Sequence, residues 1–164
     1  MADLHVSWDD YHQLTEQLAK QVHQSGWQFN QLICIARGGL RVGDVLSRIF
    51  DLPLAILSTS SYTEKAGTVR GELMIAEQMT MASGKLGDRI LLVDDLVDSG
   101  VTLEAVTRTL PQRYPIIALR TAVLWYKACS VFKPDYYVDY LPDDPWIHQP
   151  FEKYDSMRPE DIPA

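Results

Sequence analysis

Five segments of the chain are dense in apolar residues and are separated by longer, more polar stretches. Three of them are apolar at every position, which is typical of strands buried on both faces of a parallel sheet. We predict strands at residues 32–36, 54–57 and 90–93, within 115–124 and at 136–140.

Apolar residues at helical spacing fill the intervals between these strands. We predict helices at residues 8–24, 40–50 and 103–113. Ser7 is an N-cap candidate for the first helix, with Asp10 at the capping-box position, and Gly26 follows its end. Strands that alternate with helices predict an α/β fold, in which helices flank a mainly parallel central sheet.

The alternation of predicted strands and helices is interrupted between residues 62 and 88. Residues 63–71 are rich in charge and glycine, and residues 73–81 fit either a hairpin or a short helix. Because long irregular segments of a compact domain are usually functional or disordered, we expect a mobile loop here. The segment from residue 142 onward holds several prolines. We expect it to wrap the domain as extended chain and to form a small hood.

Composition narrows the class of protein. The chain of 164 residues fits a single domain, 1–164, and its 46% of hydrophobic residues is an ordinary globular value. A formal net charge of −7 argues against non-specific binding of nucleic acid or of an anionic membrane. Cys34 and Cys129 are too few for a disulfide framework, and their apolar neighbours predict buried, reduced thiols.

The start of the chain lacks a basic region followed by an apolar core. Its uncharged stretches are far shorter than the ~20 residues that span a bilayer. We therefore expect a cytoplasmic protein with no signal peptide and no integral membrane segment.

Residues 90–102, with the sequence ILLVDDLVDSGVT, carry the most chemical information. A buried strand ends there in two carboxylates, and open α/β sheets bind ligands beyond the carboxyl ends of their strands. Asp94 and Asp95 would repel each other unless a divalent cation or a sugar diol lies between them. Gly100 then permits a tight turn into a helix whose N-terminal N–H groups suit a phosphate. These features predict a ribose 5-phosphate site, with the anomeric carbon near Asp98.

Other phosphate-binding motifs are absent from the sequence. Gly84-Lys85 is not followed by the Ser or Thr of a P-loop. The glycines between Gly38 and Gly43 lack the spacing of a dinucleotide-binding motif. Receiver domains also carry paired aspartates at a strand end, but in their first strand, whereas most of this chain precedes Asp94. A solvated acidic turn that only caps a helix explains single residues of the stretch, but not the ordered set.

Residues 90–102 resemble the phosphoribosyl pyrophosphate signature of the type I phosphoribosyltransferases. The signature has four apolar residues, two acids, two apolar residues, then Asp, Ser, Gly, any residue and Thr. The resemblance covers most of the chain and points to the bacterial xanthine-guanine group, whose other landmarks are VSWD at 6–9, ARGGL at 36–40, SSY at 60–62 and WIHQP at 146–150. It implies the type I phosphoribosyltransferase fold. It also implies transfer of phosphoribose from phosphoribosyl pyrophosphate to a 6-oxopurine (guanine, xanthine or hypoxanthine), with release of pyrophosphate, in purine salvage.

The resemblance assigns roles to the residues of the signature. Asp94 and Asp95 would bind the ribose hydroxyls and the magnesium shell, so Mg²⁺ is the expected cofactor. Asp98 would face N7 of the purine, as general base or as hydrogen-bond acceptor. The 5-phosphate would be held by Ser99, Gly100, Val101 and Thr102.

Arg37 and Gly38 resemble the pyrophosphate loop of the family, which often contains a non-proline cis peptide. A glycine-backed loop at a strand end presents N–H groups, and arginine offers a planar fork to phosphate oxygens. Lys127 resembles the lysine that donates to the purine 6-oxo group. The resemblance thus implies Asp98, Lys127 and Arg37 as catalytic residues.

Further positions concern the base and a closing loop. Trp146 resembles the aromatic residue that stacks on the base, and Ile147 the residue whose backbone contacts the purine 2-position. Arg70 would match, with an insertion, the mobile-loop arginine that closes over pyrophosphate. His148 departs from the acidic residue expected after the Trp-Ile pair, which leaves the choice among oxopurines open.

Two other functions stay open at this point. One is a regulator with this fold that binds nucleotide or RNA without turnover, although the acidic charge argues against RNA. The other is a phosphoribosyltransferase for a pyrimidine or another base, against which Lys127 and Trp146 argue. The resemblance also implies a homo-oligomer, dimer or tetramer.

Overall fold

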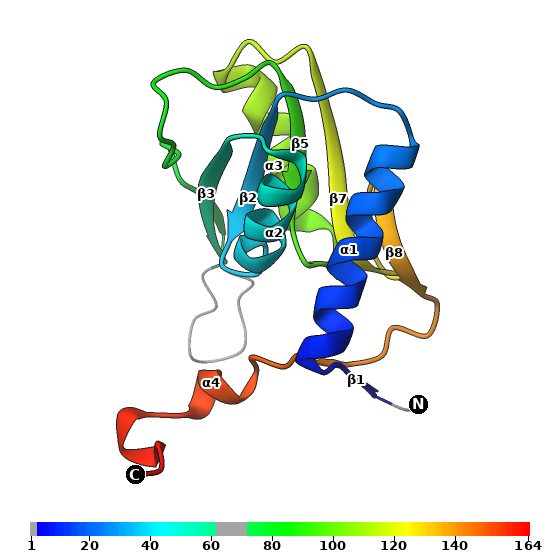
Figure 1. Cartoon of the computed structure of the whole chain (residues 1–164), viewed down its shortest axis with the longest axis vertical. Helices are drawn as coiled ribbons and strands as arrows, with labels where there is room; N and C mark the ends of the chain where they lie inside the picture. The colour runs from blue at the N-terminus through cyan, green and yellow to red at the C-terminus, as the bar shows by residue number, and fades with distance from the viewer. Residues whose placement is uncertain (1–2, 62–71) are drawn as a thin grey trace.

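A seven-stranded sheet forms the centre of the protein, for which the computed structural model describes residues 3–61 and 72–164. Neighbouring strands in the middle of the sheet run parallel to one another (Figure 1). They stand in the order β3 (Leu54–Ser61), β2 (Gln31–Ala36), β5 (Arg89–Val93) and β7 (Ala118–Lys127).

The edges of the sheet are completed by three further strands. The short strand β6 (Leu96–Val97) pairs with β7 just beyond β5, and β8 (Tyr136–Leu141) lies parallel along the opposite edge of β7. At the other end of the sheet, β4 (Leu73–Ile75) is antiparallel to β3. The predicted mainly parallel sheet is therefore confirmed.

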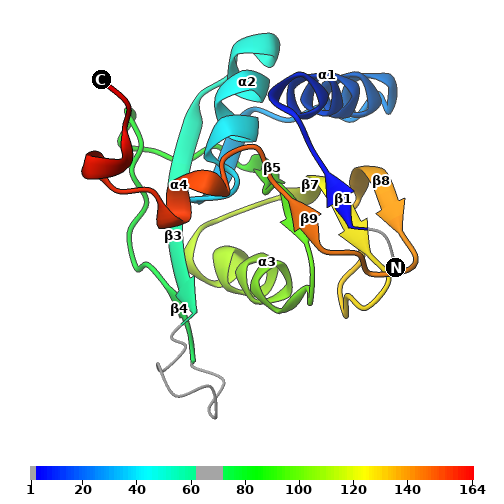
Figure 2. The ribbon, with the colours of Figure 1, turned by 90° about the horizontal axis from the view of Figure 1, so that it is seen from below.

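Helices cover both faces of this sheet. Helices α1 (Trp8–Gln24) and α2 (Leu40–Phe50) pack on one face, and α3 (Val101–Arg113) packs on the other (Figure 2). The strands between them contribute side chains to two hydrophobic clusters, one under α1 and α2 and one under α3. No helix within residues 3–61 and 72–164 has the length and apolarity required to cross a membrane.

The predicted helices 8–24 and 40–50 coincide with α1 and α2. Ser7 and Asp10 form the expected capping box, each side chain accepting from the other residue's backbone N–H at 3.1 Å. The third helix begins at Val101, two residues before the predicted start, because Gly100 at φ +83° turns the chain directly into it.

The predictions for residues 73–81 and for the segment from residue 142 onward agree only in part with the structure. Of the alternatives for residues 73–81, a helix is wrong, because β4 pairs with β3 and Thr80 bridges to Ile56. The expected extended tail is correct only at its start, where β9 (Ile147–His148) pairs with β1 (Leu4–His5) (Figure 2). Residues 151–158 contain no proline, so no residue there interrupts a short helix. The helices α4 (Lys153–Ser156) and η1 (Pro159–Asp161) follow there.

Candidate active site

Two loops meet at the carboxyl ends of the adjacent strands β2 and β5. The chain leaves β2 through a cis peptide between Ala36 and Arg37, which agrees with the implied pyrophosphate loop. A Cβ on Gly38 would stand 2.7 Å from Asp95 Oδ1 and 3.2 Å from Asp94 Oδ1. The backbone of the Arg37-Gly38 loop thus lies against the acidic pair.

Asp94 and Asp95 are half-buried side by side. Burial raises the pKa of both carboxyls above the usual range, and the charge of Asp95 raises the pKa of Asp94 further. The Asp95 N–H donates to Asp94 Oδ1 at 2.9 Å, which fixes the orientation of that carboxyl group. A cation or the hydroxyls of a sugar would relieve this electrostatic strain, so the pair suits the ligands predicted for it.

The turn from Asp98 to Gly100 leads directly into α3. Gly100 is the N-cap residue of α3 and has no side chain with which to cap it. The first N–H groups of the helix therefore remain oriented toward the turn, where a phosphate can accept from them. Asp98 and Ser99 are exposed at this place, whereas Gly100 is buried.

One cavity of about 270 Å³ unites these loops with the end of β3, which contributes Thr59. The predicted residues that line it are Gly38, Asp94, Asp95, Asp98, Ser99, Gly100 and Thr102. Arg37 lines a neighbouring cavity of about 290 Å³ together with Gly38 and Arg41. Val101 is exposed, and Arg70 lies outside the described residues.

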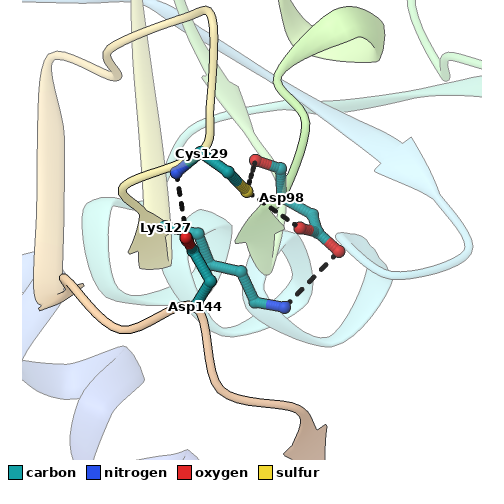
Figure 3. Close-up of polar contacts among 4 residues, drawn as sticks. All are labelled: Asp98, Lys127, Cys129 and Asp144. Atoms are coloured by element: carbon teal, nitrogen blue, oxygen red, sulfur yellow. Dashed lines mark hydrogen bonds and ion pairs between the residues drawn. The ribbon is translucent and has the colours of Figure 1, made fainter.

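Lys127 lies next to Asp98. Its side chain is only 7% exposed, and Nζ is 3.5 Å from Asp98 Oδ2 (Figure 3). The prediction of a strand within residues 115–124 would leave Lys127 in the loop after it, which is wrong. Pairing with β8, where Lys127 lies opposite Leu141, extends β7 to Lys127 itself. The lysine is thus held by the sheet rather than by a loop.

Cys129 is a neighbour of Asp98 that the sequence does not predict. Its thiol lies 3.6 Å from Asp98 Oδ1, and its backbone N–H donates to Asp144 Oδ1 at 3.0 Å (Figure 3). The prediction of a buried thiol is correct for Cys34 and wrong for Cys129, because Cys129 lies in the turn after β7 instead of a strand. Partial desolvation raises the pKa of the Cys129 thiol, and the carboxylates of Asp144 and Asp98 raise it further. The thiol therefore stays protonated and can donate.

Trp146 and Ile147 face opposite ways on the hood. The indole of Trp146 is 60% exposed, and its Nε1 donates to Glu152 Oε1 at 3.4 Å. The Ile147 side chain is buried. The carbonyls on either side of it accept from β1, Trp146 O from Leu4 N and His148 O from Val6 N. The N–H and C=O of Ile147 therefore point away from β1, where a ligand can reach them.

His148 stands where an acidic residue is expected, and its ring contacts two carboxylates of other residues. Its ring nitrogens lie 3.0 Å from Asp3 Oδ2 and 3.2 Å from Glu152 Oε2, and the ring stacks on His5 with centroids 4.4 Å apart. The hydrogen bond to Asp3 raises the pKa of His148, and the charge of Glu152 adds to this effect. The hood thus carries a histidine that readily takes a positive charge next to Trp146 and Ile147.

Gly39 offers a direct test of how closely the two loops pack. A Cβ there would stand 2.7 Å from the Val93 carbonyl oxygen and 2.8 Å from that of Ile35. Because backbone carbonyls cannot swing aside, we expect Gly39→Ala to lower the free energy of unfolding by about 1–3 kcal/mol. Gly84→Ala is the matched control, since a Cβ at Gly84 meets nothing within 4 Å. Urea denaturation measures both, and equal stability of the two variants would contradict this packing.

Comparison with known proteins agrees with this geometry. Residues 7–156 match the model of the phosphoribosyl transferase domain. A xanthine-guanine phosphoribosyltransferase of Gluconobacter oxydans is 32% identical over 154 residues, which cover 90% of this chain and 83% of the relative. The resemblance to the type I phosphoribosyltransferases is thereby confirmed.

Solved structures give the same result. A purine phosphoribosyltransferase of Pyrococcus horikoshii superposes with a TM-score of 0.76 at 29% identity, covering 93% of this chain and 95% of the other. The xanthine-guanine-hypoxanthine phosphoribosyltransferase of Helicobacter pylori gives 0.75 at 29% identity, with 90% and 92% covered. From the signature, the fold and these relatives together, the chain belongs to the phosphoribosyltransferase family.

Proposed function

We propose that this protein transfers phosphoribose from phosphoribosyl pyrophosphate to a 6-oxopurine base and releases pyrophosphate, in purine salvage. The observation that carries the proposal is the convergence of three loops on one cavity. The acidic pair, the Arg37-Gly38 loop and the start of α3 all reach it. A sugar that bears a phosphate at one end and a pyrophosphate at the other matches this arrangement of groups. The relatives named above act on purines according to their names.

Asp98 and Lys127 match one edge of an oxopurine. Guanine presents N7 and O6 side by side on that edge. Asp98 lines the cavity, and Lys127 lies beside Asp98. Lys127 would donate to O6, while Asp98 would take the proton from N7 as N9 attacks the anomeric carbon. The C1′–N9 bond forms while the bond to pyrophosphate breaks. Adenine carries an amino donor in place of O6, so it would face Lys127 unfavourably.

The remaining groups orient the substrates. The exposed indole of Trp146 would stack on the base, the backbone groups of Ile147 that point away from β1 would contact its 2-position, and Arg37 would bind pyrophosphate oxygens. Asp94 and Asp95 supply part of an oxygen shell of the kind that Mg²⁺ completes with substrate oxygens and water. When bound, Mg²⁺ neutralises charge that develops on the departing pyrophosphate.

The cellular setting belongs to the same proposal. The free thiols of Cys34 and Cys129 support a reducing, cytoplasmic location. A homo-oligomer, dimer or tetramer, belongs to the proposal on the ground of the family alone.

Pyrophosphate release with Mg²⁺ and a panel of bases tests this function. We expect turnover with one or more of guanine, xanthine and hypoxanthine, and little with adenine or uracil. Turnover with none of the bases would favour a regulator that only binds nucleotide. Preferred turnover of uracil would show a pyrimidine enzyme instead.

Lys127→Ala separates binding of the base from binding of the sugar. The loss of a charged donor should raise the KM of the oxopurine about 10- to 100-fold, while the KM of phosphoribosyl pyrophosphate changes little. Lys85→Ala is the control, because Lys85 is exposed and lines neither of the two cavities described above. An equal rise of both KM values for Lys127→Ala would show that this lysine does not select the base.

A further inference from the structure

The turn that follows β7 lies between the phosphate turn and the hood. On one side, the Val131 N–H donates to Ser99 O at 2.9 Å, and Gly100 packs against Ser130 so closely that no Cβ would fit. On the other side, the Cys129 N–H donates to Asp144 Oδ1 at 3.0 Å. The turn therefore touches both walls of the proposed base site.

Cys129 also contacts the side chain of Asp98. Its thiol lies 3.5 Å from the carbonyl oxygen and 3.6 Å from Oδ1 of Asp98. The other carboxylate oxygen, Oδ2, faces Lys127 at 3.5 Å (Figure 3). The carboxylate is thus held from two sides, by an ammonium group and by a thiol that acts as a weak donor.

Asp144 lies two residues before Trp146, on the segment that leads into the hood. Its backbone is left-handed, at φ +49°, a conformation that asparagine and glycine tolerate well. Its carboxylate accepts from the turn at the point where the chain passes toward Trp146. The hydrogen bond from Cys129 to Asp144 therefore helps to set where the indole of Trp146 lies relative to Asp98 and Lys127.

We infer that Cys129 and Asp144 are positioning residues that act as a pair. Asp144 holds the segment that leads to Trp146 against the turn after β7, and the Cys129 thiol holds the Asp98 carboxylate in its orientation toward the base. Neither residue needs to touch the reacting atoms. The inference rests on the proposed function, since it assigns the slot between Trp146 and Asp98 to the purine.

Three substitutions at one position separate the hydrogen bond from the backbone conformation. Asp144→Gly keeps the left-handed φ and removes the acceptor, whereas Asp144→Asn keeps both an acceptor and the φ. We expect Asp144→Gly to raise the KM of the oxopurine about tenfold, with the KM of phosphoribosyl pyrophosphate unchanged, and Asp144→Asn to restore most of the loss. Asp143→Gly, at the exposed neighbouring residue, is the matched control and should behave like the wild type.

Cys129 is tested independently, because Cys129→Ala keeps the backbone N–H to Asp144. We expect Cys129→Ala to lower kcat several-fold and to shift the acidic limb of the kcat/KM pH profile, and Cys129→Ser to restore both in part. The Tm of each Asp144 and Cys129 variant is measured as well, to establish that the variant is folded.

Two outcomes overturn the inference. The first is an active wild type in which Asp144→Gly and Asp144→Asn have the same KM for the base. The second is a Cys129→Ala variant with an unchanged kcat and pH profile. Either result leaves the proposed function intact. A wild type that turns over no purine would overturn both the inference and that function.

Discussion

Replacing Asp98 with asparagine should lower kcat by about a hundredfold to ten-thousandfold, the usual contribution of a general base. The binding of phosphoribosyl pyrophosphate should change little. Asparagine occupies the same space, but its single carbonyl oxygen can accept from either Cys129 or Lys127 and not from both, because these groups face different oxygens of Asp98. It cannot take a proton from the purine, so the loss falls on the chemical step. Steady-state rates together with calorimetric binding of phosphoribosyl pyrophosphate measure the two effects separately.

A matched control is Asp51→Asn. Asp51 is exposed and has a left-handed backbone, φ 52°, that asparagine tolerates, and it ends α2 far along the chain from the turn at Asp98. It should retain wild-type rates. Wild-type turnover in Asp98→Asn would remove the assigned base role, and a parallel loss of sugar-phosphate binding would assign Asp98 to the sugar instead.

Asp94→Asn should have opposite effects on function and on stability. We expect the affinity for phosphoribosyl pyrophosphate with Mg²⁺ to fall about 10- to 100-fold, because one charged acceptor is lost. The free protein should become more stable at neutral pH, because half-burial and the charge of Asp95 raise the pKa of Asp94. The Tm of Asp94→Asn without Mg²⁺ should therefore lie above that of the wild type at pH 7.

The direction of the pH dependence follows from the raised pKa. The folded chain holds a proton on Asp94 at pH values where the unfolded chain has already lost it. Folding is therefore penalised above the unfolded pKa, most strongly above the folded one, and the penalty vanishes below about pH 4. The Tm advantage of Asp94→Asn without Mg²⁺ should grow from acidic to neutral pH. A lower Tm than the wild type at pH 7 would show that the carboxylate is stabilising rather than strained.

Much of the fold could be predicted from local signals. Helix α1 is bounded by Ser7 and Asp10 at its start and Gly26 after its end, and the strands at 32–36 and 90–93 are apolar because both of their faces are buried. Features that depend on partners distant in sequence could not be predicted. Lys127 belongs to β7 because it pairs with Leu141 of β8.

The residues of the site also fall into a group that local sequence predicts and a group that it does not. Asp94, Asp95, Asp98 and the turn to Thr102 are contiguous, so a single motif predicts them, and the structure places them around one cavity. Cys129 and Asp144 belong to no motif. Their contact depends on how the turn after β7 meets a segment that lies 15 residues further along the chain. Only the position of Cys129, two residues after Lys127, could have drawn attention to it.

The most direct measurement is a crystal structure of the protein with phosphoribosyl pyrophosphate and Mg²⁺. The account predicts electron density for the 5-phosphate over the N–H groups at residues 99–102, the ribose hydroxyls at Asp94 and Asp95, and the pyrophosphate on the Arg37-Gly38 loop. Density for the ligand in another cavity, or with its 5-phosphate away from the start of α3, would contradict it.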